Sequence, residues 1–175
     1  MYINRHLFEE LDGYEAYLYS AIKSLILPEE KGFMQSNEFL MGAINEPCVH
    51  CLEIRLEGLI RNGYIEITTK DGDRIIYLKK FPEPQKKEHC LKIDILRDIS
   101  WLKPLMKVWL SYILEELKTE KRVKVDNTLF LLDVPTDGEF NEEFKEAFQW
   151  IRSYGIGITD DGYLISIHSL VNPTS

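Results

Sequence analysis

The sequence lacks long apolar runs. Charged residues interrupt every hydrophobic stretch well short of the roughly 20 residues that a membrane-spanning helix needs. Acidic side chains occur early in the N-terminal stretch, so we expect neither a signal peptide nor a transit peptide. These features favour a cytoplasmic protein that has no membrane partner.

Cysteine is scarce. The three cysteines are Cys48, Cys51 and Cys90, and an odd number in a chain of this length argues against a disulfide framework. We therefore expect a reducing compartment.

An excess of positive charge is also missing. The chain has 21 Lys and Arg against 29 Asp and Glu, a net charge of −8, and acids outnumber bases in each half. Proteins that bind nucleic acid without sequence preference need clustered Lys and Arg. Strong non-specific binding to DNA is therefore not expected, and any DNA site needs a local concentration of positive charge.

The common catalytic motifs are absent as well. The sequence has no G-x-S-x-G, P-loop, dinucleotide fingerprint or H-E-x-x-H. We expect a protein that is not an enzyme and that uses no cofactor.

A folded core is clearly encoded. Of the 175 residues, 45% are hydrophobic and 29% are charged, which is typical of a globular protein with one or two small domains. The segment FPEPQKKEH, residues 81–89, combines two prolines with a run of charges. It predicts a linker between a domain of residues 1–80 and a second domain of residues 90–175.

The first half shows helical periodicity followed by a hairpin. Apolar spacing predicts a helix over 14–25 that Asp12 caps and Pro28 ends, after which Phe33 and Met34 form an extended piece. A short helix capped by Ser36 or Asn37 follows, then a turn over 45–47 that places Pro47 in the first turn of the next helix.

The helix after that turn should span about residues 48–62. Its expected buried stripe consists of Val49, Leu52, Leu56, Leu59 and Ile60. Gly63 should end the helix in the left-handed conformation. Strands over 64–70 and 74–80 follow, joined by a turn at Asp71-Gly72.

The second half has a similar mixture. Residues 91–120 are helical for most of their length, with a new helix beginning at Pro104. Residues 122–134 are rich in strand formers, with a turn at Asp126-Asn127. A helix over 141–155 then leads into a hairpin that turns at Asp161-Gly162.

The two halves share a local plan. Leu56 and Leu59 correspond to Phe148 and Ile151, and each helix leads through a glycine to a strand, an Asp-Gly turn and a strand. Chance can produce such an echo over about 20 residues. If the echo is a repeat, the second copy is degenerate, because no clear short helix precedes its long one.

The stretch SNEFLMGAINEPCVHCLEIRLEGLIRNGYIEI, followed by TTKDGDRIIYL, resembles the winged-helix branch of the helix-turn-helix proteins. It is most similar to such domains in phage and plasmid replication proteins and in small bacterial regulators. The resemblance covers about residues 14–80. It implies an α+β protein with an N-terminal winged helix-turn-helix and a C-terminal domain of helices and hairpins, one form of which is a degenerate second winged helix.

The resemblance implies a sequence-specific protein that binds double-stranded DNA in transcription control or replication, from a bacterium or phage. The third helix would enter the major groove and the hairpin would touch the backbone. The C-terminal half would mediate homodimerisation or contact a protein partner. The implied DNA-binding residues are Ser36, Asn37, Cys48, His50, Cys51, Arg55, Lys70 and Arg74.

The acidic residues of the same helix and hairpin support an alternative to DNA binding. Glu53 and Glu57 lie on the same helix, and Asp71 and Asp73 lie on the hairpin. Carboxylates repel the DNA backbone. The alternative is a protein-binding winged helix from a mobile element that modulates a host protein, for example as an acidic mimic of nucleic acid.

A zinc site is a weaker alternative. The pair Cys48 and Cys51, together with His89 and Cys90, would supply four zinc ligands. The second pair lacks the spacing of a zinc knuckle. We expect small buried or exposed thiols and no metal.

Overall fold

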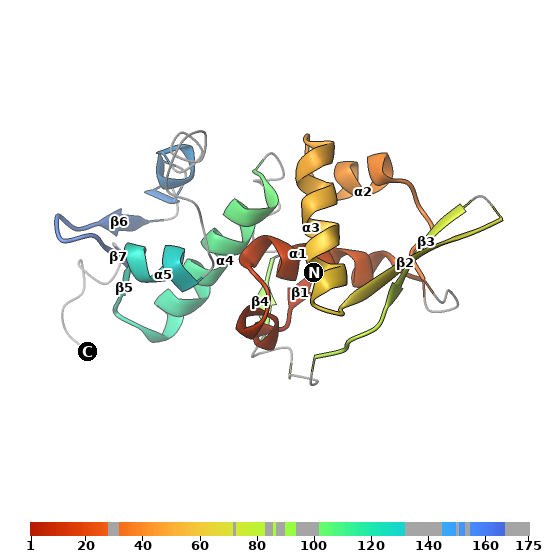
Figure 1. Ribbon diagram of the computed structural model, residues 1–175. Coiled ribbons are helices and arrows are strands. Elements are labelled where there is room, and N and C mark those ends of the chain that lie inside the picture. The colour runs from red at the N-terminus through yellow and green to blue at the C-terminus, as the bar shows by residue number, and fades with distance from the viewer. Residues whose placement is uncertain are drawn as a thin grey trace.

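The computed structural model describes residues 1–27, 32–71, 73–82, 86, 90–93, 102–131, 145–149, 151–152 and 155–166, with the side chains of 127, 130 and 131 excepted. The fold is α+β, as predicted, and its sheets are small. Figure 1 shows two groups of elements side by side, with the hairpins β2–β3 and β6–β7 at opposite ends.

The first group begins with α1, Gly13–Leu25, which lies at the centre of the molecule. The side chain of Asp12 accepts a hydrogen bond from the amide of Glu15 at 2.7 Å and so caps this helix, as predicted. Most of α1 is buried, since α2 and α3 pack against it and α4 covers it from the second group. The predicted end at Pro28 lies outside the described residues, and the last helical residue is Leu25.

Two further helices and a hairpin complete the first group. Ser36 caps α2, Asn37–Ile44, and Cys48 caps α3, Val49–Arg61. Strands β2, Ile65–Lys70, and β3, Asp73–Leu78, pair in antiparallel register. Phe33 adds a bridge to Ile76 of β3, which confirms the predicted extended piece.

Gly63 ends α3 with a φ of +73°, as predicted. The amide of Tyr64 donates back to the carbonyl of Leu59 at 2.9 Å, which closes the last turn. Asp71 at the hairpin turn also has a positive φ, of 54°, which fits the predicted tight turn.

The second group begins with α4, Pro104–Thr119, whose start at Pro104 confirms the prediction. Strand β5, Arg122–Lys124, and helix α5, Val125–Leu131, come next. Residues 145–149 and 151–152 are helical. Strands β6, Ile156–Ile158, and β7, Tyr163–Ser166, form the predicted hairpin, with Gly162 at a φ of +78° in its turn.

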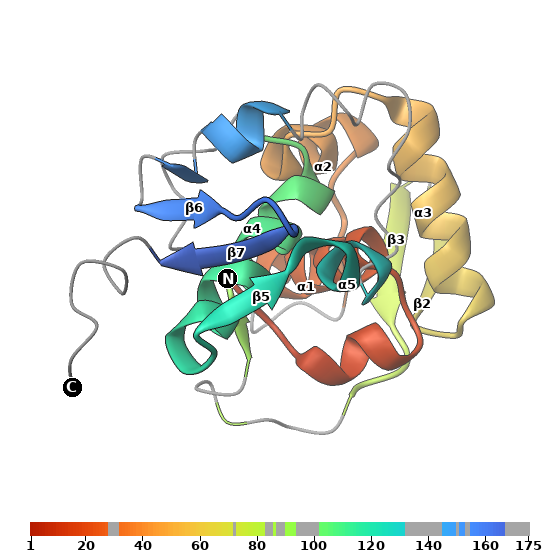
Figure 2. The same cartoon turned by 90° about the vertical axis from the view of Figure 1, so that its left-hand side faces the viewer.

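The two groups follow the same order of elements. Each has a first helix, a short extended piece, a second helix, a third helix and a hairpin. In each, the extended piece pairs with the last strand: Phe33 bridges to β3, and β5 pairs with β7. Figure 2 shows the second sheet, with β7 between β5 and β6. The expectation that the second copy lacks a short second helix is therefore wrong, because α5 occupies that position.

Several local predictions are wrong for identifiable reasons. Residues 91–92, expected to be helical, form strand β4, Leu91–Lys92, because they pair with β1, Tyr2–Ile3. Residues 125–131 are helical rather than extended, and the expected turn at Asp126-Asn127 lies inside α5. Pro47 precedes the capping residue Cys48 and so lies outside the first turn of α3.

The buried stripe of α3 is narrower than predicted. Leu52, Leu56 and Leu59 are buried, whereas Val49 and Ile60 are exposed. The extra apolar residues lie on the outward side of the helix, so α3 has apolar groups on both faces.

The stretches on either side of residues 81–89 share one hydrophobic core. Ile3, Leu18 and Leu59 belong to the same buried cluster as Trp109 and Leu164. A polar contact joins the same regions, because Arg5 Nη1 lies 2.8 Å from Glu116 Oε1. The division into domains of residues 1–80 and 90–175 stays a prediction. The described residues of these two stretches pack against each other.

Candidate functional site

The predicted DNA-binding residues lie on the second and third helices and on the hairpin of the first group. His50 and Cys51 are exposed on the first turns of α3. Lys70 is exposed at the end of β2, next to the hairpin turn. Ser36 lies at the start of α2, where its hydroxyl accepts a hydrogen bond from the amide of Phe39 at 3.2 Å.

Arg55 is not directed outward like its neighbours. Its guanidinium forms an ion pair with Asp12 and lies 5.4 Å from the centre of the Tyr14 ring. These contacts hold Arg55 against the start of α1. A contact with guanine would require this ion pair to open, and the predicted role in base reading stays untested.

Arg74 also lies against the protein. It is partly buried on β3, and its Nη2 lies 3.5 Å from the carbonyl oxygen of Gln35. Burial lowers the pKa of this guanidinium, while the nearby Glu38 raises it. The side chain therefore links β3 to the start of α2. There, the side-chain oxygen of Asn37 is buried without a hydrogen-bond partner among the described residues.

The outward face of α3 carries acidic and apolar side chains together with the exposed His50 and Arg61. Glu53 and Glu57 are exposed there, and Val49, Ile54 and Ile60 are each about 45% exposed. We call this surface the outer α3 face. Large exposed apolar side chains between acids are typical of a protein contact rather than of a phosphate-binding surface.

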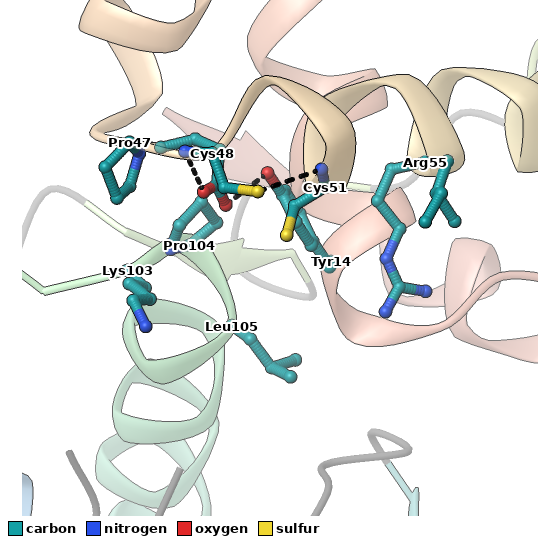
Figure 3. Close-up of a pocket in the computed structure, with 10 residues that line it drawn as sticks. Tyr14, Pro47, Cys48, Cys51, Arg55, Lys103, Pro104 and Leu105 are labelled. Carbon is teal, nitrogen blue, oxygen red and sulfur yellow. Dashed lines mark hydrogen bonds between the residues drawn. The ribbon is translucent and has the colours of Figure 1, made fainter. Parts of the chain in front are cut away.

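A cavity of about 350 Å³ lies beside this face, where the first turns of α1, α3 and α4 meet. Figure 3 shows Cys48 and Cys51 at the start of α3, Tyr14 on α1, and Lys103 at the start of α4 around this space. The lining residues are Tyr14, Glu46, Pro47, Cys48, Cys51, Ile54, Arg55, Lys103, Pro104 and Leu105. Thus both groups of elements contribute to this cavity.

Glu46 is the buried acid of this cavity, with 6% of its surface exposed. One carboxylate oxygen accepts a hydrogen bond from the Tyr14 hydroxyl at 2.7 Å. The other accepts from the backbone amide of Cys48 at 2.9 Å. Burial and the bond to Glu46 raise the pKa of Tyr14, which keeps its hydroxyl protonated as the donor.

The turn before α3 fixes Glu46 in this position. Asn45 adopts the left-handed conformation with a φ of 61° and ends α2. Its side-chain amide donates to the carbonyl of Leu102 at 3.2 Å, and the buried Lys107 lies 3.4 Å from the carbonyl of Ile44. The second group of elements therefore anchors the turn that carries Glu46.

The two thiols interact with each other. The amide of Cys51 donates to the sulfur of Cys48 at 3.3 Å, so Cys48 caps α3 through its side chain. Hydrogen bonds from the thiol and the amide of Cys51 lower the pKa of Cys48. The same thiol contact raises the pKa of Cys51 to about 11. The contact therefore makes the Cys48 thiol easier to deprotonate than the Cys51 thiol.

Glu46, Cys48 and Cys51 form a cluster that the sequence analysis missed. Their carboxylate and sulfur atoms all lie within 4.8 Å of one another. Among the described residues, Cys90 is not part of this cluster, and His89 lies outside the described residues. The available signal was the order E-P-C-x-x-C, which places an acid two residues before the thiol pair.

Comparison with known proteins gives no assignment. No protein-family model, curated protein or solved structure matches this chain. Within the described part of the chain, the helices are too short or too polar to span a membrane.

Proposed function

We propose that the protein binds a specific site on double-stranded DNA through winged-helix domains, as a regulator or a replication-associated protein. The observation that carries this proposal is the repeated order of elements, in which an extended piece pairs with the second strand of a hairpin that follows three helices. This order is that of the winged helix to which the sequence of the first group is similar.

The surface of the first group limits how DNA would be held. With Arg55 engaged by Asp12, the accessible groups for contact include His50 on α3 and Lys70 on the hairpin. Lys70 would contact a phosphate, and His50 would reach a base edge. Because the acids of α3 oppose the phosphates, binding would depend on a few contacts at the correct sequence rather than on general attraction.

The first experiment is selection of duplex DNA from a random pool at two salt concentrations. We expect one enriched motif whose affinity falls as salt rises. Lys70→Ala should weaken binding to all sequences and reduce the salt slope by about 1, since one phosphate contact is lost. His50→Ala should change the preferred sequence.

The control for charge is Lys118→Ala, which removes an exposed lysine from the end of α4, outside the proposed contact surface. It should leave affinity and the salt slope unchanged. No enrichment at either salt concentration would refute the DNA proposal.

A second candidate function rests on the outer α3 face. Three exposed apolar residues beside two glutamates suit a protein partner that offers apolar and basic groups. In this reading, the winged helix binds a host protein, and the carboxylates take the place of phosphates.

Charge reversal separates the two candidates. If α3 meets DNA, Glu57→Lys should strengthen DNA binding, because it replaces a repulsion with an attraction. If α3 meets a basic protein surface, a photo-crosslinking residue at position 57 should capture one defined partner. A photo-crosslinking residue at position 54 should capture that partner too. Combining the crosslinker at position 54 with Glu57→Lys should prevent the capture.

A further inference from the structure

The strongest unassigned feature is the cluster of Glu46, Cys48 and Cys51 at the start of α3. Two sulfurs and a carboxylate converge within 4.8 Å of one another at the edge of a cavity. Cys48 and Cys51 are one helical turn apart, so both side chains lie on the same side of α3, as Figure 3 shows. This inference is independent of the proposed function.

We propose that Glu46, Cys48 and Cys51 bind a thiophilic divalent metal ion, with zinc as the natural choice. Two thiolates and one carboxylate are a suitable ligand set for zinc, which takes sulfur, nitrogen and oxygen ligands in a tetrahedral arrangement. Three protein ligands leave a fourth position, which faces the cavity of about 350 Å³.

The geometry needs only a small adjustment. Tetrahedral zinc with bonds of about 2.3 Å to sulfur places two sulfurs roughly 3.8 Å apart. The ligand atoms here lie within 4.8 Å of one another, so side-chain rotations of Cys48 and Cys51 can close the site. The backbone of the first turn of α3 does not have to move.

The carboxylate is already fixed for this role. Glu46 is buried, and its two oxygens accept hydrogen bonds from Tyr14 and from the amide of Cys48. A carboxylate has about four lone-pair directions, so both oxygens keep capacity for a metal. Tyr14 then acts as a positioning residue that orients the ligand through a hydrogen bond.

The surrounding charge also fits. Two thiolates, a carboxylate and a divalent ion together carry a net charge of about −1. The first turn of α3 provides the partial positive charge of a helix N-terminus, and Lys103 and Arg55 line the same cavity. These positive groups favour a metal cluster with a net negative charge.

Cobalt(II) is the probe for the first test, because its bonds to thiolate give a charge-transfer absorption. Reduced full-length protein should bind one equivalent of Co²⁺ with such a band, and Zn²⁺ should displace it. Cys48→Ser and Cys51→Ser should each remove most of the charge-transfer intensity. Serine is a good helix-capping residue, so the Cys48 variant should remain folded.

Further variants test the oxygen ligand and its support. Glu46→Gln should weaken Co²⁺ binding by tenfold or more, and Tyr14→Phe should weaken it by about tenfold through loss of the orienting hydrogen bond. Cys90→Ser is the matched control, which removes the remaining thiol and should leave affinity and spectrum unchanged. Circular dichroism of each variant establishes that it is folded.

Three results would overturn the proposal. They are the absence of a charge-transfer band at excess Co²⁺, loss of the band in Cys90→Ser, or unchanged affinity in a folded Glu46→Gln variant. A Cys48–Cys51 disulfide that forms in air at the same rate with and without Zn²⁺ would also refute it, since bound metal must protect its thiolates.

Discussion

At the scale of single residues, burial shifts the pKa of one carboxyl group on α1. Glu15 on α1 is partly buried, and its carboxylate lies over the backbone of Gly58 on α3. Burial raises the pKa of Glu15, and the charge of Asp12 raises it further. The folded protein therefore favours the protonated form of this side chain more than the unfolded chain does.

This shift predicts a pH dependence of stability. Because the folded-state pKa lies above the ordinary value of 4.5, the favourable contribution of protonated Glu15 is complete below that pH and is lost as the pH rises through the folded pKa. Glu15→Gln should therefore be more stable than the natural protein at pH 7 and similar to it at pH 4. Urea unfolding at both pH values measures the difference.

Glu57→Gln is the control, since it removes the same charge from an exposed position of α3. It should not reproduce the gain at pH 7. If both substitutions stabilised the protein equally at pH 7, the gain would come from the change in net charge and not from the burial of Glu15.

At the scale of elements, the ends of the helices follow local chemistry that the sequence makes visible. Asp12, Ser36 and Gly63 occupy the capping positions that their residue types favour. The exceptions are the segments 91–92 and 125–131, whose neighbours decide their conformation. Strand β4 exists because β1 pairs with it. Helix α5 packs against α4 through the bond of Thr128 to Trp109 Nε1 at 2.9 Å.

The cap of α2 provides an element-scale prediction. The Ser36 hydroxyl accepts a hydrogen bond from the amide of Phe39, so Ser36→Ala should lower the free energy of unfolding by about 1 kcal/mol. Ser24→Ala is the comparison. The Ser24 hydroxyl donates to a carbonyl of its own helix, so its removal should change the free energy of unfolding little. Denaturant unfolding of the two variants tests the cap, and equal losses would contradict it.

At the scale of the whole molecule, the two groups of elements form one packed unit. Helices α1 and α4 pack together, and the buried cluster runs through both groups. All three tryptophans lie in the second half of the sequence. Tryptophan fluorescence therefore originates only from residues 90–175 of the sequence, which makes it a useful test of coupling.

Leu59→Ala removes a fully buried side chain from α3, far in sequence from any tryptophan. Such a change should cost about 2–5 kcal/mol. Because the core is shared, unfolding followed by tryptophan fluorescence should shift by the same amount as unfolding followed by circular dichroism. An unshifted fluorescence transition would mean that residues 1–80 and 90–175 unfold independently.

Ile60→Ala, at the neighbouring position, is the matched control. Its side chain is 44% exposed, so its removal should change either transition by much less than Leu59→Ala does. This comparison separates loss of the shared core from loss of an apolar group on the outer α3 face.

The sequence by itself determined the elements that depend on local chemistry. Helical spacing, caps and Asp-Gly turns located α1 to α3, the start of α4 and both hairpins, because each signal lies within a few residues of the structure it specifies. It also located the thiol pair at the start of α3. The sequence revealed the similarity between the two hairpins. It did not reveal the helix α5, because the residues of that segment favour strands.

Only the tertiary structure decided what surrounds these elements. The ion pair of Arg55 with Asp12 joins residues 43 positions apart, and the bond of Tyr14 to Glu46 spans 32. Periodicity cannot report contacts at such separations, since it describes one element at a time. The burial of Glu46 beside two thiols, and the sharing of one core across residues 81–89, follow from how helices pack and not from the composition of any segment.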